Sequence, residues 1–298
     1  PSLVSAPSTK KWALSFTPKQ PTLAEFISGA GYRTVAIISA EKVFTSHPHA
    51  LRGFGEVDRA PVRVWRRNRY AASTHVDRVI TALSDPMRGP AFVWTHLLDT
   101  HQYYSPGPHP KKFRGAHGRY RSSIHAVDRA LGRLLDFARS PERRDHTIVI
   151  FTADHGQSLG EWGLSKNLHG FSTLSSETHV PLAIWGPRFQ PARIDEPISL
   201  LDLFPTLTRW VGRPEPAGGC ARDLTEALLG AHPLTPRPFM LEQVPDESKD
   251  TFGVSWVSKR RKLDGLPHRG LWAIQDLSPD APPPLEALPK DPPPPRES

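Results

Sequence analysis

The sequence predicts an α/β protein with a mostly parallel central sheet flanked by helices, followed by a small β-rich subdomain. Runs rich in β-branched and apolar residues, at 34–38 and 147–151, are typical of strands that are buried on both faces. Stretches with apolar residues at helical spacing separate these runs, and this alternation indicates a parallel sheet. Proline and glycine become frequent after residue 212. We therefore expect an α/β domain over residues 1–212, a small subdomain over 213–280 and an extended proline-rich tail over 281–298.

Local patterns predict the order of the elements. Thr22 is followed three residues later by Glu25, which is a capping-box pattern, so we expect a helix to begin near Thr22. Other helices are expected where apolar residues recur at helical spacing, which occurs within 76–83, 124–134 and 200–211. The remaining expected strands lie at 91–94, 180–185, 239–242 and 251–256.

Composition narrows the class of protein. With 38% hydrophobic and 23% charged residues, the chain has no run near the roughly 18 apolar residues that a membrane helix needs. The net charge of +8 suits an anionic partner, which could be a nucleic acid, a membrane or a substrate. The basic clusters at 63–69, 111–114 and 259–262 carry no zinc-finger or RNA-recognition pattern, so we interpret them as solvated surface and predict no nucleic-acid partner. We expect a soluble protein; a periplasmic or secreted location and the oligomeric state stay open.

Chemistry-bearing residues gather directly after the predicted strand at 147–151. Asp154, His155 and Gly156 interrupt the apolar run there. Ligands bind outside the carboxyl ends of strands in open α/β sheets, so this position favours function. A carboxylate beside an imidazole suits a hard or borderline divalent cation. The alternative is that the pair caps a helix or forms hydrogen bonds in the core.

The surrounding motifs resemble those of the sulfatase family in the alkaline-phosphatase superfamily, which also contains phosphate- and phosphonate-ester hydrolases. The family pattern T-x-D-H-G, G-E-x-G, Lys, His-Gly and E-x-x-V-P-L matches, in order, residues 152–156, 160–163, 166, 169–170 and 177–182. Residues 96–104 are similar to its H-x-x-D-x-H-x-P-Y segment, with Tyr103 where proline is usual. Residues 270–277 resemble its E-L-Y-D-L motif, so the resemblance covers roughly residues 5–280.

The resemblance implies a role for each matching residue. Asp154 and His155 would be metal ligands, and the metal would be calcium first, with manganese, magnesium or zinc as alternatives. His101 and Lys166 would contact the anionic ester oxygens, and His101 would also protonate the leaving group. His169 would bind substrate in the same site. The implied partner is a small anionic ester, with sulfate first and phosphate or phosphonate as alternatives.

Other readings of these side chains stay open. His101 could be an ordinary loop histidine, and Lys166 could be a solvent-facing amine. We interpret His96 as structural. The single cysteine, Cys220, excludes an internal disulfide and any metal site built from several cysteines, and we interpret it as a structural thiol in a loop.

The nucleophile is predicted near the amino terminus. Residues 6–9 resemble the A-P-x-T segment of threonine-type members, which favours Thr9, whereas an S-x-P-S reading of residues 5–8 would favour Ser5. Because Cys220 lies far from this segment, formylglycine chemistry is excluded. A hydroxyl nucleophile would need activation by the metal, since its own pKa is far above neutral pH.

Two functions from different classes follow. The family's first strand, which ends in two acidic metal ligands, has no counterpart before Pro1, so we expect the α/β domain to be incomplete at its amino terminus. The first hypothesis is a metal-dependent sulfuric ester hydrolase whose other ligands lie elsewhere. The second is a catalytically inactive or truncated sulfatase fold that acts as a binding scaffold.

Overall fold

The computed structural model describes residues 21–39, 44, 48–59, 71–101, 117–159, 169–170, 172–213, 221–243, 253–259, 261–266 and 271–277. The chain divides into two compact units. Unit 1 comprises Pro1–Arg143 and Leu201–Asp223, and unit 2 comprises Arg144–Leu200 and Leu224–Ser298. The domain boundaries at 212 and 280 stay predictions, and the tail at 281–298 lies outside the described residues.

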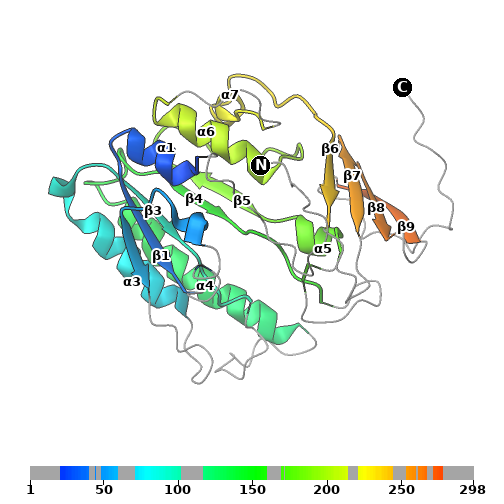
Figure 1. Ribbon diagram of the computed structural model, residues 1–298, viewed down its shortest axis with the longest axis horizontal. Coiled ribbons are helices and arrows are strands. Elements are labelled where there is room, and N and C mark those ends of the chain that lie inside the picture. Colours follow the sequence, from blue (N-terminus) through cyan, green and yellow to red (C-terminus); the bar gives the residue numbers. More distant parts are fainter. Residues whose placement is uncertain are drawn as a thin grey trace. The chain divides into compact units, whose positions relative to one another are not determined.

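Unit 1 contains a three-stranded parallel sheet in the order β2-β1-β3 (Figure 1). Its strands are β1 (Arg33–Ile38), β2 (Glu56–Arg59) and β3 (Ala91–Thr95). Five consecutive residues of β1 are buried, which fits a central strand with neighbours on both sides. The predicted strands at 34–38 and 91–94 are therefore confirmed as a parallel pair.

Two long helices cover one face of this sheet, α3 (Ala71–Ser84) and α4 (Gly118–Ala138) (Figure 1). Val35 and Ile37 of β1 pack with Val79 of α3 and, around them, with Leu134 of α4. A second cluster joins the two helices directly, through Ala72, Val76, Val127 and Ala130. Alternate residues of β1 therefore point at the helices, and apolar burial holds the layers together.

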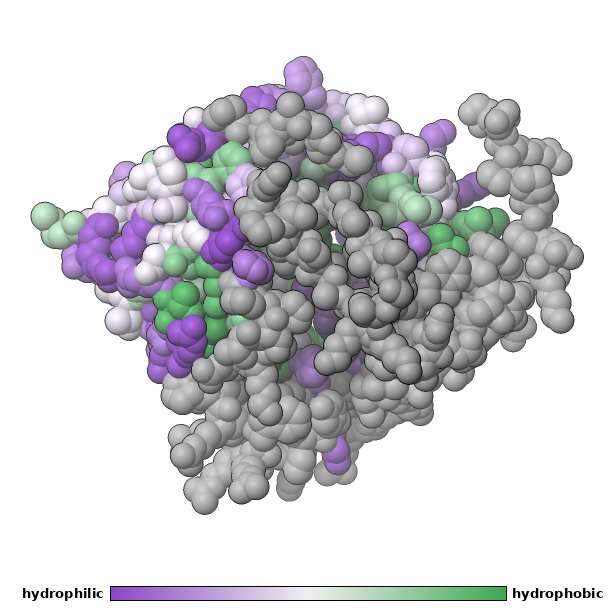
Figure 2. Space-filling view, viewed as in Figure 1, coloured by the Kyte–Doolittle hydropathy of each residue, from purple (hydrophilic) through white to green (hydrophobic). Residues whose placement is uncertain are grey.

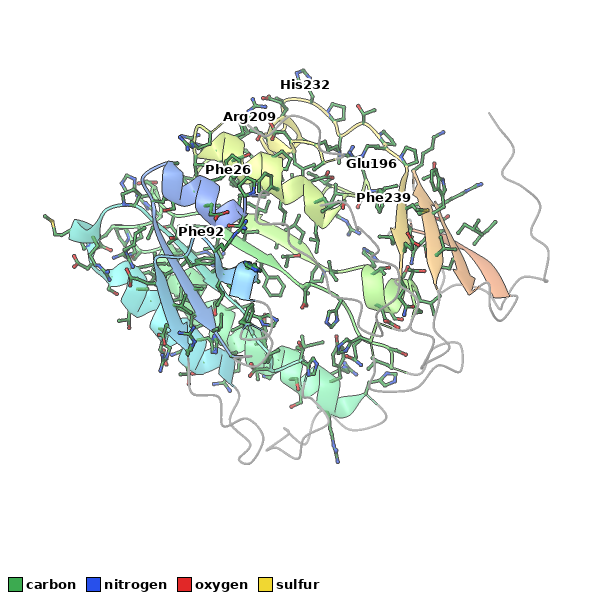
Figure 3. The ribbon with its side chains drawn as sticks, viewed as in Figure 1. Phe26, Phe92, Glu196, Arg209, His232 and Phe239 are labelled. Carbon is green, nitrogen blue, oxygen red and sulfur yellow. The ribbon has the colours of Figure 1, made fainter. Side chains whose placement is uncertain are left out.

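The short helix α1 (Leu23–Gly29) begins as the sequence predicts. The Thr22 hydroxyl accepts from the Glu25 amide at 3.2 Å, and the Glu25 carboxylate accepts from the Thr22 amide at 2.7 Å. Phe26 of α1, which is labelled in Figure 3, meets Phe204 edge-on, with ring centroids 5.3 Å apart. Phe204 lies in α6 (Leu203–Trp210), which follows the 3-10 turn η4 (Leu200–Asp202). Two further 3-10 turns in this unit are η1 (Pro48–Leu51) and η2 (Pro86–Arg88).

Unit 2 contains two antiparallel sheets. The predicted strand at 147–151 appears as β4 (Val149–Thr152), and its partner β5 (Leu182–Trp185) runs antiparallel to it. The second sheet has the order β6-β7-β8-β9. Its strands are β6 (Phe239–Glu242), β7 (Val254–Ser258), β8 (Arg261–Leu266) and β9 (Leu271–Asp276). The helices in the described residues of this unit are α5 (Ser175–Thr178) and α7 (Thr225–Leu228).

The two faces of the β6–β9 sheet differ in exposure, and this corrects one expectation. Met240, Trp256 and Ile274 are about half exposed on one face, whereas Lys262 is 2% exposed on the other. The basic cluster at 259–262 was expected to be solvated surface, and for Lys262 this is wrong. Successive residues of a strand point to opposite faces, so Arg261 is exposed while its neighbour is buried.

The surface of the described residues is mixed in polarity. On the face drawn in Figure 2, hydrophilic residues adjoin smaller hydrophobic areas. None of the helices in the described part of the chain has the length and apolar character needed to cross a membrane.

Candidate active site

The candidate site is built on the turn that follows β4. The Gly156 amide donates to the Glu177 carbonyl at 2.7 Å, and the Gln157 amide donates to the Ser176 carbonyl at 2.8 Å. These two bonds pin the turn against α5. A Cβ atom on Gly156 would lie 2.1 Å from the Ser176 carbonyl oxygen, closer than any van der Waals contact allows. Only glycine fits this close approach of two backbones.

Asp154 and His155 present their donor atoms on this turn. The His155 amide donates to Asp154 Oδ1 at 2.9 Å, which fixes the carboxylate beside the imidazole. His155 Nδ1 lies 2.8 Å from the Gly156 carbonyl oxygen. Because that oxygen can only accept, Nδ1 carries the proton, and Nε2 keeps the lone pair that a metal ligand needs. Nε2 is 3.7 Å from Asp154 Oδ2, and the two side chains are 40% and 64% exposed.

His169 lies beside this pair. Its ring stacks on that of His155, with centroids 4.1 Å apart and an interplanar angle of 26°. His169 Nδ1 is 3.1 Å from Gln157 Oε1, an acceptor, so its Nε2 also keeps a lone pair. The structure thus brings together three of the predicted site residues, Asp154, His155 and His169, although their roles stay predictions.

Glu177 stabilises the placement of His155 and His169. The sequence patterns assigned it no role. Its carboxylate is 3% exposed and accepts from the Gly170 amide at 2.6 Å and from the Ser172 hydroxyl at 2.8 Å. Its backbone carbonyl accepts from Gly156. One residue therefore ties the segments that carry His155 and His169. The signal for this role was its place in the E-x-x-V-P-L motif.

Two other predicted residues lie at the end of β3 in unit 1. His101 is exposed in a turn, where its amide donates to the Leu98 carbonyl at 3.1 Å. The nearby Asp99 carboxylate accepts from the Ala72 amide at 3.0 Å, which caps the start of α3. His96 stacks on Trp94 with ring centroids 6.0 Å apart, an aromatic contact that suits the structural role expected for it.

The structure does not describe the other residues that the sequence singled out. Ser5, Thr9, Lys166 and Cys220 lie outside the described residues. Within the ranges that the structure describes, no group of three or more His, Cys, Asp or Glu side chains is placed so that all of them could hold one metal ion. Asp154 and His155 therefore fit a divalent cation as two members of a larger ligand set, with one oxygen and one nitrogen donor.

Comparison with known proteins shows the family. The profile of the Sulfatase family matches residues 7–213, and the chain belongs to this family. An uncharacterised sulfatase of Escherichia coli is 37% identical over 81 residues, which are 27% of this chain and 16% of that protein. The chain thus spans less than a fifth of this relative's length.

Solved structures show the same fold at low identity. A protein solved with its substrate D-glucosamine-2-N,6-O-disulfate has a TM-score of 0.62 and 15% identity, over 88% of this chain and 76% of that one. A phosphonate monoester hydrolase from Silicibacter pomeroyi has a TM-score of 0.58 and 15% identity, over 89% and 73% of the two chains. The predicted α/β fold class and the sulfatase resemblance are confirmed.

Proposed function

We propose that this protein is a metal-dependent hydrolase of sulfate esters. The observation that carries the proposal is the convergence of Asp154 Oδ2 and His155 Nε2, 3.7 Å apart on an exposed turn after β4. A carboxylate and an imidazole whose other nitrogen is occupied by a carbonyl are typical metal ligands. Membership of the sulfatase family supports the same reaction.

The cation is proposed to be calcium, with manganese, magnesium or zinc as alternatives. When bound, it would stabilise negative charge on the ester oxygens and make a nearby hydroxyl more acidic. Asp154 and His155 would hold it, and the bond from His155 Nδ1 to Gly156 would keep the ring in the binding orientation. Thr9 is proposed as the nucleophile, with Ser5 as the alternative.

Three cationic or hydrogen-bonding side chains are proposed to act on the ester. His101 and Lys166 would contact its anionic oxygens, and His101 would donate a proton to the leaving oxygen. His169 would bind the sulfate group from its place beside His155. The net charge of +8 would favour the approach of an anionic substrate.

The proposed substrate is a small sulfate ester, and two structural neighbours suggest its range. One was solved with a disulfated glucosamine, which supports a sulfated sugar as the alcohol part. The other hydrolyses phosphonate monoesters, which makes these esters the second candidate class. Both anions are tetrahedral, and the described side chains would contact either through the same oxygens.

The test replaces one ligand and a matched surface carboxylate. In Asp154→Asn, metal content measured on the purified protein should fall, and hydrolysis of an aryl sulfate should drop by at least about 100-fold. The control is Asp145→Asn, because Asp145 is 66% exposed in the same unit and pairs only loosely with Arg144 at 3.7 Å. Melting temperature should change little in either variant.

Clear outcomes would contradict the proposal. Full metal content in Asp154→Asn would remove Asp154 from the ligand set. A wild-type protein that binds metal and hydrolyses neither aryl sulfate nor aryl phosphonate would favour the inactive scaffold instead.

A further inference from the structure

A lysine is buried in unit 2 with every donor hydrogen occupied. Lys262 is 2% exposed and its Nζ lies 2.7 Å from Asp264 Oδ1, a carboxylate that is itself 3% exposed. The same ammonium donates to the Thr173 carbonyl oxygen and, at 3.1 Å, to the Thr178 hydroxyl. The Ser175 hydroxyl lies farther away, at 3.4 Å. An ammonium has three hydrogens, so these acceptors occupy all of them.

A second set of bonds joins the same partners. The Ser255 hydroxyl lies 2.6 Å from Asp264 Oδ1 and 2.6 Å from Thr173 Oγ1. Gly253 also approaches the segment closely, since a Cβ there would lie 3.0 Å from the Thr173 amide nitrogen. Strands β7 and β8 are therefore fastened by polar contacts to residues 172–178.

The stability of the fold does not by itself explain why the buried residues Lys262 and Asp264 are charged. Replacing a buried ion pair by apolar residues of similar volume is often neutral or stabilising. A buried ammonium does, however, fix the position of each group that accepts one of its hydrogen bonds. Here two acceptors, Thr173 and Thr178, bracket α5, so Lys262 fixes both ends of that short helix.

Helix α5 in turn carries the groups that hold the candidate site. The Ser176 and Glu177 carbonyls accept from Gln157 and Gly156, the two residues that follow His155. The Glu177 carboxylate accepts from Gly170, the residue next to His169. A displacement of α5 would therefore shift the two histidines relative to each other.

We propose that Lys262 is a positioning residue for the candidate site: it fixes α5 and, through Glu177 and Ser176, the stacked placement of His155 and His169. It acts through these residues and touches neither imidazole. The consequence for catalysis rests on the proposed function, but the consequence for the histidine pair does not.

The experiment uses the full chain and two readouts. In Lys262→Met, the ring-proton shifts of His155 and His169, which report the 4.1 Å stacking, should move measurably in NMR spectra. The affinity for Mn²⁺ alone, measured by calorimetry, should weaken about 10- to 100-fold, as for other residues that orient ligands. Arg261→Met is the matched control, because it removes the same charge from the exposed neighbour.

A second variant covers the case in which Lys262→Met unfolds. Lys262→Met with Asp264→Asn removes both charges of the buried pair and should fold, yet its histidine shifts and Mn²⁺ affinity should still change. Wild-type shifts and affinity in this folded double variant would overturn the proposal. If wild-type protein binds no Mn²⁺, the proposed function fails, while the histidine shifts still decide whether Lys262 positions the pair.

Discussion

The two units each bury a chain of polar side chains, but one chain is neutral and the other is ionic. In unit 1, the Thr95 hydroxyl donates to the Ile37 carbonyl at 3.2 Å and accepts from His75 Nδ1 at 2.9 Å. His75 Nε2 then accepts from the Ser39 hydroxyl at 2.5 Å. In unit 2, the buried polar side chains are instead centred on a charged pair, Lys262 and Asp264.

The difference appears in how burial acts on each titratable group. Burial, with added repulsion from Arg78 and His96, lowers the pKa of His75 to about 4, so the imidazole is neutral at pH 7. Burial also lowers the pKa of Lys262, but the Asp264 carboxylate opposes that shift. A neutral chain needs only hydrogen-bond partners, whereas an ionic pair needs its countercharge. The two regions should therefore fail under different perturbations.

The largest effect is expected when the ionic pair is broken on one side. Asp264→Leu leaves the Lys262 ammonium buried without its countercharge, which should lower the free energy of unfolding by about 3–5 kcal/mol. Urea denaturation monitored by circular dichroism measures this loss. The double variant Lys262→Met with Asp264→Leu should recover most of it, and a double variant as unstable as Asp264→Leu would contradict the ionic interpretation.

The neutral chain should instead fail in acid. Because the folded pKa of His75 is about 4 against an ordinary 6.5, its stabilising contribution is complete above pH 6.5 and is lost as the pH falls through 4. The full contribution is about 3–4 kcal/mol, because the pKa falls from 6.5 to about 4 and each pH unit corresponds to about 1.36 kcal/mol. Urea titrations at several pH values should show this loss in the wild type.

Variants test the assignment of the acid sensitivity to His75. His75→Gln cannot take up the proton, so the decline in stability between pH 6.5 and 4 should become shallower by a similar amount. His49→Gln, at an exposed histidine of unit 1, is the control and should leave the decline unchanged. An unchanged slope in His75→Gln would assign the acid sensitivity to other groups.

Local sequence signals predicted much of the fold and part of the site. The capping box at Thr22, the apolar run of β1 and the strand before Asp154 depend on residues close in the sequence, and all three are present. Strand β2 was not predicted because it is short and its four residues include three charged ones. The motif order pointed to His155 and His169, whose rings the structure stacks.

Long-range pairings were the part that the sequence could not predict. Ser39 and His75 are 36 residues apart, and Lys262 reaches Thr178 across 84 residues. Neither pair lies within one helix or strand, so no periodicity links its members. The run of four basic residues at 259–262 also predicts a solvated surface. Only the strand pairing shows which face of β8 each side chain occupies, and that Lys262 lies on the buried one.

The smallest effect on stability is expected at the ion pairs of Glu56 on the surface of unit 1. Comparing them with the buried pair tests whether burial, and not pairing alone, determines the loss. Glu56 is 42% exposed and pairs with Arg33 at 3.3 Å and with Arg88 at 2.7 Å. Water already solvates Glu56 and Arg88, and Arg33, which is 14% exposed, keeps its bond to the Ala82 carbonyl. Glu56→Gln should therefore cost less than about 1 kcal/mol of unfolding free energy. The cost should shrink further in 1 M NaCl, where the screening length is about 3 Å. The loss in Asp264→Leu should persist at the same salt concentration, because its partner is buried. A salt-independent cost of Glu56→Gln as large as that of Asp264→Leu would show that burial is not what distinguishes the two pairs.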